Sequence, residues 1–80
     1  MNENKLGQFA LWLQERKGFS QTVTKDTQSR IRRANRILPF KDKDIYLFYL
    51  NQADDFQKCT TSVRSQIRRA VRLYREYLHS

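Results

Sequence analysis

The segment Ser29–Ile37, SRIRRANRI, returns thirty-six residues later as Ser65–Leu73, SQIRRAVRL. In both copies apolar residues recur at steps of three or four with arginines between them, which is typical of an amphipathic helix. Only two Gly and one Pro occur in the 80 residues, so strands joined by tight turns have little support. The chain is therefore predicted to be all-α, with one helix pattern used twice.

Outward from this repeat, four helices are expected. They cover about Glu3–Arg16, Thr22–Leu38, Asp42–Ala53 and Thr60–Leu78. The first ends at Gly18, because glycine tolerates the left-handed conformation that closes a helix. Ser20 or Thr22 caps the second helix, and Pro39 stops it.

The apolar residues of these helices define a predicted core. Its stripes are Leu6, Phe9, Ala10 and Leu13, then Val23, Thr27, Ile31, Ala34 and Leu38, then Val63, Ile67, Ala70, Val71, Tyr74, Tyr77 and Leu78. Leu11 and Thr24 also map onto Leu47 and Thr60, so a whole helix pair is repeated. Two copies fall short of the three or more that a solenoid needs. We expect a four-helix bundle of two crossed helical hairpins that close one core.

The third helix is apolar on both sides. Asp42 and Asp44 would open it, because acids suit the positive end of a helix dipole. Its two faces are Ile45, Phe48 and Tyr49 on one side and Tyr46, Leu47 and Leu50 on the other. Such a helix is either enclosed by the core or partly a protein contact. We favour the core, and Leu11 and Trp12 pose the same question on the first helix.

Length and composition exclude several classes of protein. At 80 residues and 9.7 kDa the chain forms one domain, residues 1–80, with one modest core. Its longest apolar run, Ile45–Leu50, is far short of the ~20 residues that cross a bilayer, and no secretory signal is recognisable. Cys59 is the single cysteine, so no disulfide forms within the chain. A reducing, cytoplasmic location is expected, with association with the nucleoid when the protein is bound.

Charge is the strongest signal for a partner. Sixteen Lys and Arg against eight Asp and Glu give a net charge of +8. Such an imbalance indicates an anionic partner, with nucleic acid before acidic protein or anionic lipid. The alternative is a basic surface that only keeps a small domain soluble.

Two lines of basic residues run beside the core stripes of the second and fourth helices. They consist of Lys25, Arg32 and Arg36 on the second, and of Arg64, Arg68, Arg72 and Arg75 on the fourth. No acid occurs between Asp55 and Glu76, so the second line is unneutralised within its own helix. Two parallel ridges suit a duplex whose phosphates recur along both strands. The alternative is a solvated face whose arginine stems cover the edge of the core.

Polar clusters stand near the start of the same two helices. They are Ser20, Gln21, Thr22, Thr24, Lys25 and Gln28, and Lys58, Thr60, Thr61, Ser62 and Ser65. Free amides at a helix N-terminus attract phosphate, although ordinary N-capping accounts for one residue in each cluster. Gln21 or Gln28 could also pair with adenine in a major groove.

Signals for chemistry are weak. His79 is the single histidine, so neither a metal site with Cys59 nor a nucleophilic set can be assembled around it. Asp54 and Asp55 are adjacent and are expected in a loop rather than as paired catalytic carboxylates. No glycine-rich phosphate loop is present. We expect no catalytic residues, no metal, no small-molecule substrate and no cofactor.

Several segments together resemble a known family. The run Phe9-x-x-Trp12-Leu13-x-x-x-Lys17-Gly18-Phe19-Ser20-x-Thr22-Val23 is similar to the opening of the core-binding (SAM-like, N-terminal) domain of tyrosine recombinases and phage integrases. The segments Asp44-Ile45-x-x-Phe48-Tyr49-Leu50, Ala70-Val71-Arg72 and Tyr77-Leu78 resemble the second half of that domain. Thr27 departs from the family, which commonly has an aromatic there, and the loop 52–58 lacks the usual glycine.

The resemblance implies a DNA clamp without chemistry. In the family, the second and fourth helices of this domain approach the DNA, and the nucleophilic tyrosine belongs to a catalytic domain that this chain does not contain. Tyr74 and Tyr77 are therefore not candidate nucleophiles. With the charge pattern, the predicted DNA-contacting residues are Gln21, Thr22, Thr24, Lys25, Gln28, Arg32, Arg36, Lys58, Thr60, Ser62, Arg64, Arg68 and Arg72.

Three functions remain open at this point. The first is a module that binds double-stranded DNA, either an integrase core-binding domain or a free-standing relative in a mobile element, with other recombinase protomers as further partners. The second is a protein-interaction module that uses Tyr46, Leu47 and Leu50 to modulate a recombinase. The third is a small basic RNA-binding protein, which exposed stacking aromatics would support.

Overall fold

The computed structural model describes all 80 residues as helices and connecting loops, with no strand. The helices are α1 (Glu3–Lys17), α2 (Gln21–Ile37), α3 (Ile45–Gln52), α4 (Asp54–Gln57) and α5 (Thr61–Leu78). The all-α class is confirmed, and the bounds of α1, α2 and α5 agree with the prediction to within one residue. The short helix α4 was not predicted.

Local chemistry at the helix ends explains this agreement. Gly18 adopts φ 65° and ends α1 in the left-handed conformation. Ser20 caps α2, where its hydroxyl accepts a hydrogen bond from the Val23 N–H at 3.2 Å. Thr60 caps α5 in the same way, accepting from the Val63 N–H at 3.2 Å. Each long helix therefore begins or ends at a residue with a specific backbone role.

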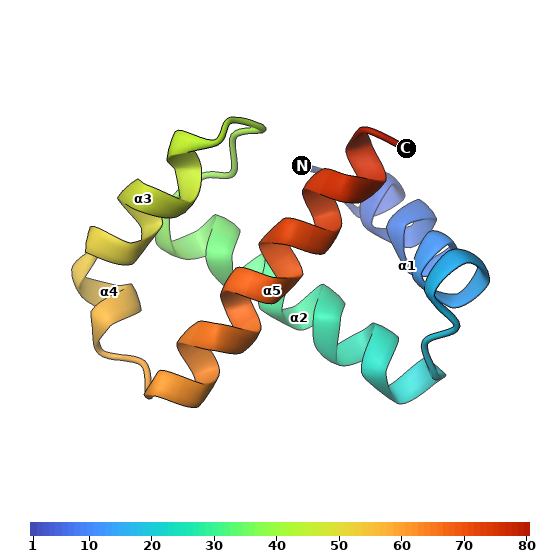
Figure 1. The fold of residues 1–80 in the computed structure, drawn as a ribbon, viewed down its shortest axis with the longest axis horizontal. Coiled ribbons are helices and arrows are strands. Elements are labelled where there is room, and N and C mark those ends of the chain that lie inside the picture. The colour runs from blue at the N-terminus through green and yellow to red at the C-terminus, as the bar shows by residue number, and fades with distance from the viewer.

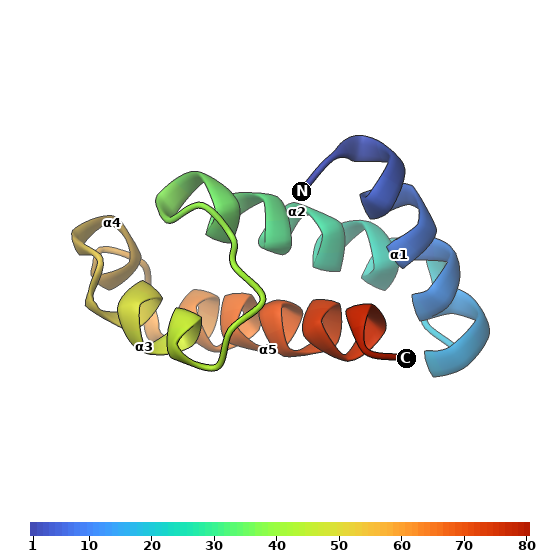
Figure 2. The same ribbon diagram turned by 90° about the horizontal axis from the view of Figure 1, so that it is seen from above.

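The two halves of the chain meet where α2 and α5 cross. Figure 1 shows this crossing near the middle of both helices, with α1 on one side of it and α3 and α4 on the other. Seen from above, α2 and α5 lie in two layers (Figure 2). The N-terminal ends of α2 and α5 both lie at the lower edge of Figure 1. This arrangement brings two capped helix starts to one side of the molecule.

The repeat supplies the contact at the crossing. Ile31 and Ala34 of α2 and their repeat equivalents Ile67 and Ala70 of α5 are all buried. Aromatic rings extend this core outward on both sides. Ring centroids lie 5.0 Å apart for Phe9–Tyr74 and Phe40–Tyr74, and 5.2 Å apart for Phe40–Tyr46. These edge-on contacts join α1, α5, the loop after α2, and α3.

The predicted start of α3 is wrong. The helix begins at Ile45, and the Asp44 side chain makes no capping hydrogen bond. Asp42 and Asp44 instead lie in the preceding loop and pair with Arg75 of α5 at 2.9 and 2.8 Å. A guanidinium with several donors therefore outcompetes the helix N-terminus for both carboxylates.

Burial settles which face of α3 belongs to the core. Tyr46 and Leu50 are buried and Leu47 is half-buried, which confirms the core interpretation for this face. The idea of a contact surface built from Tyr46, Leu47 and Leu50 is therefore wrong. Phe48 and Tyr49 on the opposite face are 54% and 55% exposed.

Two smaller predictions also change. Val23 is 43% exposed, and its neighbour Thr24 takes the inward position instead. Asp54 and Asp55 form the first turn of α4, a helix rather than a loop, and the buried Phe56 ties that helix to the core. No helix in the structure combines the length and the apolar character needed to span a membrane.

Leu11 and Trp12 differ from each other. Leu11 is 57% exposed, whereas Trp12 is half-buried and packs on the core. The Trp12 ring stacks on Phe9 at 6.2 Å and lies 5.7 Å from the Tyr77 ring. Trp12 thus covers the edge of the core.

Candidate nucleic-acid interface

Ion pairs divide the basic residues into neutralised and free groups. The paired cations are Lys17, Arg32, Lys58, Arg75 and His79, the last only when it is protonated. The other lysines and arginines have no acid within ion-pair distance, and they include Lys25, Arg30, Arg33, Arg36, Arg64, Arg68, Arg69 and Arg72 of α2 and α5.

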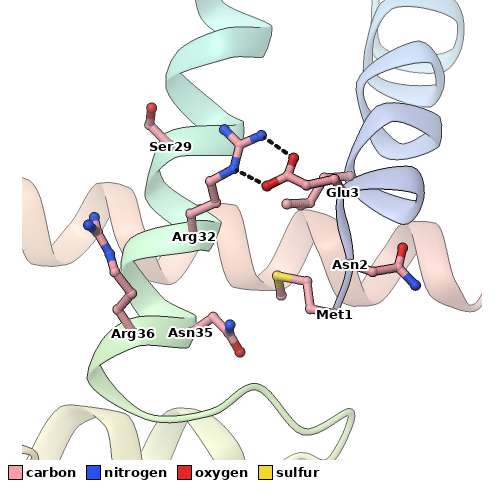
Figure 3. A pocket seen from close by; sticks show the side chains of 8 residues that line it. Met1, Asn2, Glu3, Ser29, Arg32, Asn35 and Arg36 are labelled. Atoms are coloured by element: carbon pink, nitrogen blue, oxygen red, sulfur yellow. Dashed lines mark hydrogen bonds and ion pairs between the residues drawn. The ribbon is translucent and has the colours of Figure 1, made fainter.

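The predicted ridge on α2 faces α1. Arg32 donates from Nη2 and Nε to the two Glu3 oxygens at 2.7 and 3.3 Å, and this pairing lowers the pKa of Glu3 (Figure 3). Arg32 and Arg36 line a cavity of about 390 Å³ with Met1, Asn2 and Glu3 at the start of α1. In Figure 3 the Arg36 side chain extends away from Glu3.

The predicted ridge on α5 faces α3 and its loop. Arg68 donates to the Asn51 side chain at 3.2 Å and lies 5.8 Å from the Phe56 ring centroid. Arg75 pairs with Asp42 and Asp44. Its hydrogen bond to Asp42 lowers the pKa of that carboxyl, and the same contacts raise the pKa of Arg75.

The expectation that the two ridges run parallel is therefore wrong, and acids from other elements neutralise one arginine of each ridge. The helices that carry the ridges cross, Arg75 is neutralised from another element, and Arg32 is neutralised from α1. Arg32 and Arg68 are equivalent in the repeat, and each binds the first helix of its own half, α1 or α3. Both arginines thus hold their helix pairs together.

A groove between α2 and α5 brings a different set of basic residues together. It is a hollow of about 120 Å³, which we call the α2–α5 groove. Its lining residues are Phe19, Val23, Thr27, Arg30, Gln66, Arg69, Ala70 and Leu73. Arg30 and Gln66 occupy equivalent positions in the repeat, so each helix contributes the same position to the groove.

Two arginines at equivalent positions of the repeat reach from one of these helices towards the residues that precede the other. Arg33 of α2 donates to the Cys59 sulfur at 3.4 Å, two residues before α5 begins. Its repeat equivalent Arg69 lies 5.7 Å from the ring centroid of Phe19, two residues before α2 begins. Neither arginine has an acid partner. The groove is thus lined by the Arg30 and Arg69 side chains near the start of α2, while Arg33 lies outside its lining, near the start of α5.

The polar clusters at these N-termini are only partly accessible. Gln21, Thr22, Lys25 and Ser62 are exposed. Thr24 is 2% exposed and its hydroxyl has no hydrogen-bond partner, so it is removed from the predicted DNA-contacting set.

Most of the remaining predicted residues already have a partner within the chain. Gln28 donates to the Leu6 carbonyl at 2.9 Å, and Thr60 is occupied as the cap of α5. Lys58 pairs with Asp55 at 3.8 Å while staying exposed. Arg64 is half-buried and donates to the Thr61 hydroxyl at 3.3 Å. Arg36 and Arg72 are exposed and make no ion pair.

The sequence interpretation missed Arg30, Arg33 and Arg69. Arg33 and Arg69 directly follow the ridge residues Arg32 and Arg68, so each lies about 100° around its helix from the ridge. Arg33 and Arg69 occupy equivalent positions in the two copies of the repeat, but so do Arg32 and Arg68, so the sequence carries no signal that separates them.

Other polar groups of the structure do not converge on a site. No three His, Cys, Asp or Glu side chains lie together as metal ligands would. Cys59 is half-buried, with its sulfur 3.5 Å from the Asp55 carbonyl. Burial raises the pKa of Tyr46 to about 12 and also raises that of Tyr74. Both tyrosines are core residues.

No protein-family model, curated protein or solved structure matches this chain. The likeness to integrase core-binding domains therefore rests on the sequence motifs given above. The arrangement of the basic residues is described from this structure alone.

Proposed function

We propose that this protein is a non-catalytic module of the integrase core-binding type that binds duplex DNA through the α2–α5 groove. One observation carries the proposal: Arg30 and Arg69 line the groove, and neither has an acid partner. Unpaired guanidinium groups are good phosphate ligands, because their planar donors match the phosphate oxygens.

The position of the groove supports contact with a DNA backbone. It lies between two helices whose starts are capped by Ser20 and Thr60. The start of α2 adjoins the groove through Phe19 and Val23, so the positive end of this helix dipole adds to the attraction for phosphate. Exposed Gln21 and Ser62 stand near the starts of α2 and α5 and can donate further hydrogen bonds to the backbone or to base edges.

Duplex DNA fits this surface better than RNA does. Sequence-specific RNA binding relies on aromatic side chains that stack on unpaired bases. The aromatic residue of the groove, Phe19, is half-buried and lies beside the Arg69 guanidinium. The exposed aromatics Phe48 and Tyr49 belong to α3, outside the groove.

A salt titration with three matched double variants tests the proposal. The groove variant is Arg30→Gln with Arg69→Gln, and the ridge variant is Arg36→Gln with Arg72→Gln. The control is Lys5→Gln with Arg16→Gln on α1. Each variant loses two positive charges at residues that make no ion pair. The three variants therefore have equal net charges, and differences in DNA affinity between them depend on where the charges were removed.

The parent protein should bind a labelled duplex of about two helical turns at micromolar affinity or weaker, with a log–log salt slope near −0.9 per phosphate contact. The groove variant should lose affinity and up to about two units of slope, while the control stays close to the parent. If the control loses as much duplex affinity as the groove variant, the binding depends on the overall positive charge of the protein and not on the groove. If only the ridge variant loses duplex affinity, DNA binds at the two ridges predicted from the sequence and not at the groove.

A further inference from the structure

A second surface of the molecule is apolar and has no partner within the chain. On α3, Ile45, Phe48 and Tyr49 are 48%, 54% and 55% exposed, and we call these three residues the α3 outer face. The Phe48 and Tyr49 rings lie 5.6 Å apart in an edge-on contact. Neighbouring apolar side chains of this size on a small domain mark an interaction site.

A pocket opens at one end of this face. It has a volume of about 260 Å³ and lies between α3 and the loop that follows α2. Its lining residues are Leu38, Pro39, Lys41, Lys43, Ile45, Tyr46 and Tyr49. The volume is below the usual range for a small-molecule site but suits one large side chain of a protein partner.

Charge around the pocket is positive. Lys41 and Lys43 are exposed, line the pocket and make no ion pair. The two acids of the same loop, Asp42 and Asp44, are held by Arg75. The pocket therefore presents two free ammonium groups next to an apolar surface, while its nearest carboxylates are neutralised.

From this combination we propose that the α3 outer face binds an acidic segment of a partner protein. The segment inserts one large apolar side chain into the pocket and places carboxylates beside Lys41 and Lys43. The apolar contact supplies affinity, and charge complementarity selects the partner and its orientation. Such a complex leaves the α2–α5 groove free, because the two surfaces share no lining residue.

A second copy of this chain fits the surface less well. Each copy has a net charge of +8, so two copies repel each other. Most of its acids are already used in ion pairs, which leaves Glu15, Asp26 and Asp54 unpaired. Nucleic acid also fits less well, because the edge-on rings of Phe48 and Tyr49 do not form a flat platform for bases.

Peptide display tests the proposal with a probe whose sequence is not assumed. The parent protein selects from a random library of peptides of about 15 residues, and the recovered peptides are measured by fluorescence anisotropy and by amide chemical shifts. We expect peptides with net negative charge and a large apolar residue, and we expect them to shift amides within residues 38–50.

Paired variants separate this surface from general attraction. Binding should fall about tenfold or more for Ile45→Gln with Tyr49→Gln and for Lys41→Gln with Lys43→Gln. Two controls should bind as the parent does: Leu11→Gln, which removes another exposed apolar side chain, and Lys5→Gln with Lys25→Gln, which removes two charges elsewhere.

Four results would overturn the proposal. The first is a selection that returns no peptide acting on residues 38–50. The second is equal weakening by both pairs of lysine substitutions. The third is a concentration-dependent dimer that shifts the same amides without peptide, which would assign the face to a second copy. The fourth is an oligonucleotide that shifts those amides more strongly than any recovered peptide.

Discussion

Removing a single hydroxyl from Tyr46 tests the hydrogen bond that joins the buried face of α3 to the end of α2. The Tyr46 hydroxyl donates to the Leu38 carbonyl at 2.7 Å and lies 3.2 Å from the Ala34 carbonyl. The Ala34 carbonyl also accepts a hydrogen bond from the Leu38 N–H at 2.9 Å. The Leu38 carbonyl accepts its hydrogen bond from the Tyr46 hydroxyl. The substitution Tyr46→Phe keeps the ring in place and leaves the Leu38 carbonyl without this donor.

The expected cost follows from that one hydrogen bond. Its net contribution is about 0.5–1.5 kcal/mol, and the cost rises to about 1–3 kcal/mol if the carbonyl stays buried and unsatisfied. A domain of this length has a free energy of unfolding of roughly 4–12 kcal/mol, so about 1 kcal/mol is measurable. The corresponding fall in Tm is about 4–8 °C.

A matched control lies in the same helix. Tyr49 is 55% exposed and its hydroxyl makes no hydrogen bond within the chain, so Tyr49→Phe should change stability by less than about 0.5 kcal/mol. Thermal and urea unfolding of both variants measures the difference. Equal effects of the two substitutions, or a Tyr46→Phe protein as stable as the parent, would refute a stabilising hydrogen bond from Tyr46 to the Leu38 carbonyl.

The pH dependence of stability provides a second test with the Tyr46→Phe protein. Burial raises the pKa of Tyr46 to about 12 in the folded protein, above its ordinary value of 10.0. The folded state therefore holds this proton more tightly than the unfolded chain does. Its contribution to stability is complete below pH 10 and is lost as the pH rises towards 12. The Tyr46→Phe protein should lose less stability than the parent across this interval.

Three further predictions concern other parts of the molecule. Phe56→Ala should cost about 3–5 kcal/mol, because the ring is 1% exposed and anchors α4, and far-UV circular dichroism during melting would show whether the domain still folds. The pKa values of Asp42 and Glu3 are lowered by their arginine partners. The two ion pairs therefore stabilise the folded state at a pH above the ordinary values of 3.8 and 4.5, and this contribution is lost as the pH falls below those values. The melting temperature should accordingly be lower at pH 3 than at pH 7. Asp26→Asn removes the one acid of α2 and should strengthen duplex binding at low salt, as measured by anisotropy.

Much of the fold could be predicted from local sequence because the deciding interactions are local. The caps at Ser20 and Thr60 and the left-handed Gly18 act within a few residues, and the period of the apolar stripe extends over several turns. The helix α4 covers only four residues, less than two turns, so no apolar period can form there. Its stability comes from the burial of Phe56, which is a tertiary contact.

The remaining differences arise from contacts between distant residues. From its local sequence, Asp42 suits the start of a helix as well as it suits an ion pair. It forms the ion pair because Arg75, thirty-three residues later in the chain, lies within hydrogen-bond distance of its carboxylate. The candidate site shows the same limit. A helical projection groups Arg32 with Arg36, but it does not reveal that α1 covers this side or that Arg69 borders a groove with α2.

The central claim is that DNA lies on the α2–α5 groove, and an NMR titration tests it most directly. Unlabelled duplex is added to uniformly ¹⁵N-labelled protein at low salt, and amide shifts are followed residue by residue. We predict that shifts concentrate in residues 19–33 and 59–70, with the side-chain resonances of Arg30 and Arg69 among them. Shifts centred on α1 or α3, or no shifts at low salt, would contradict the account.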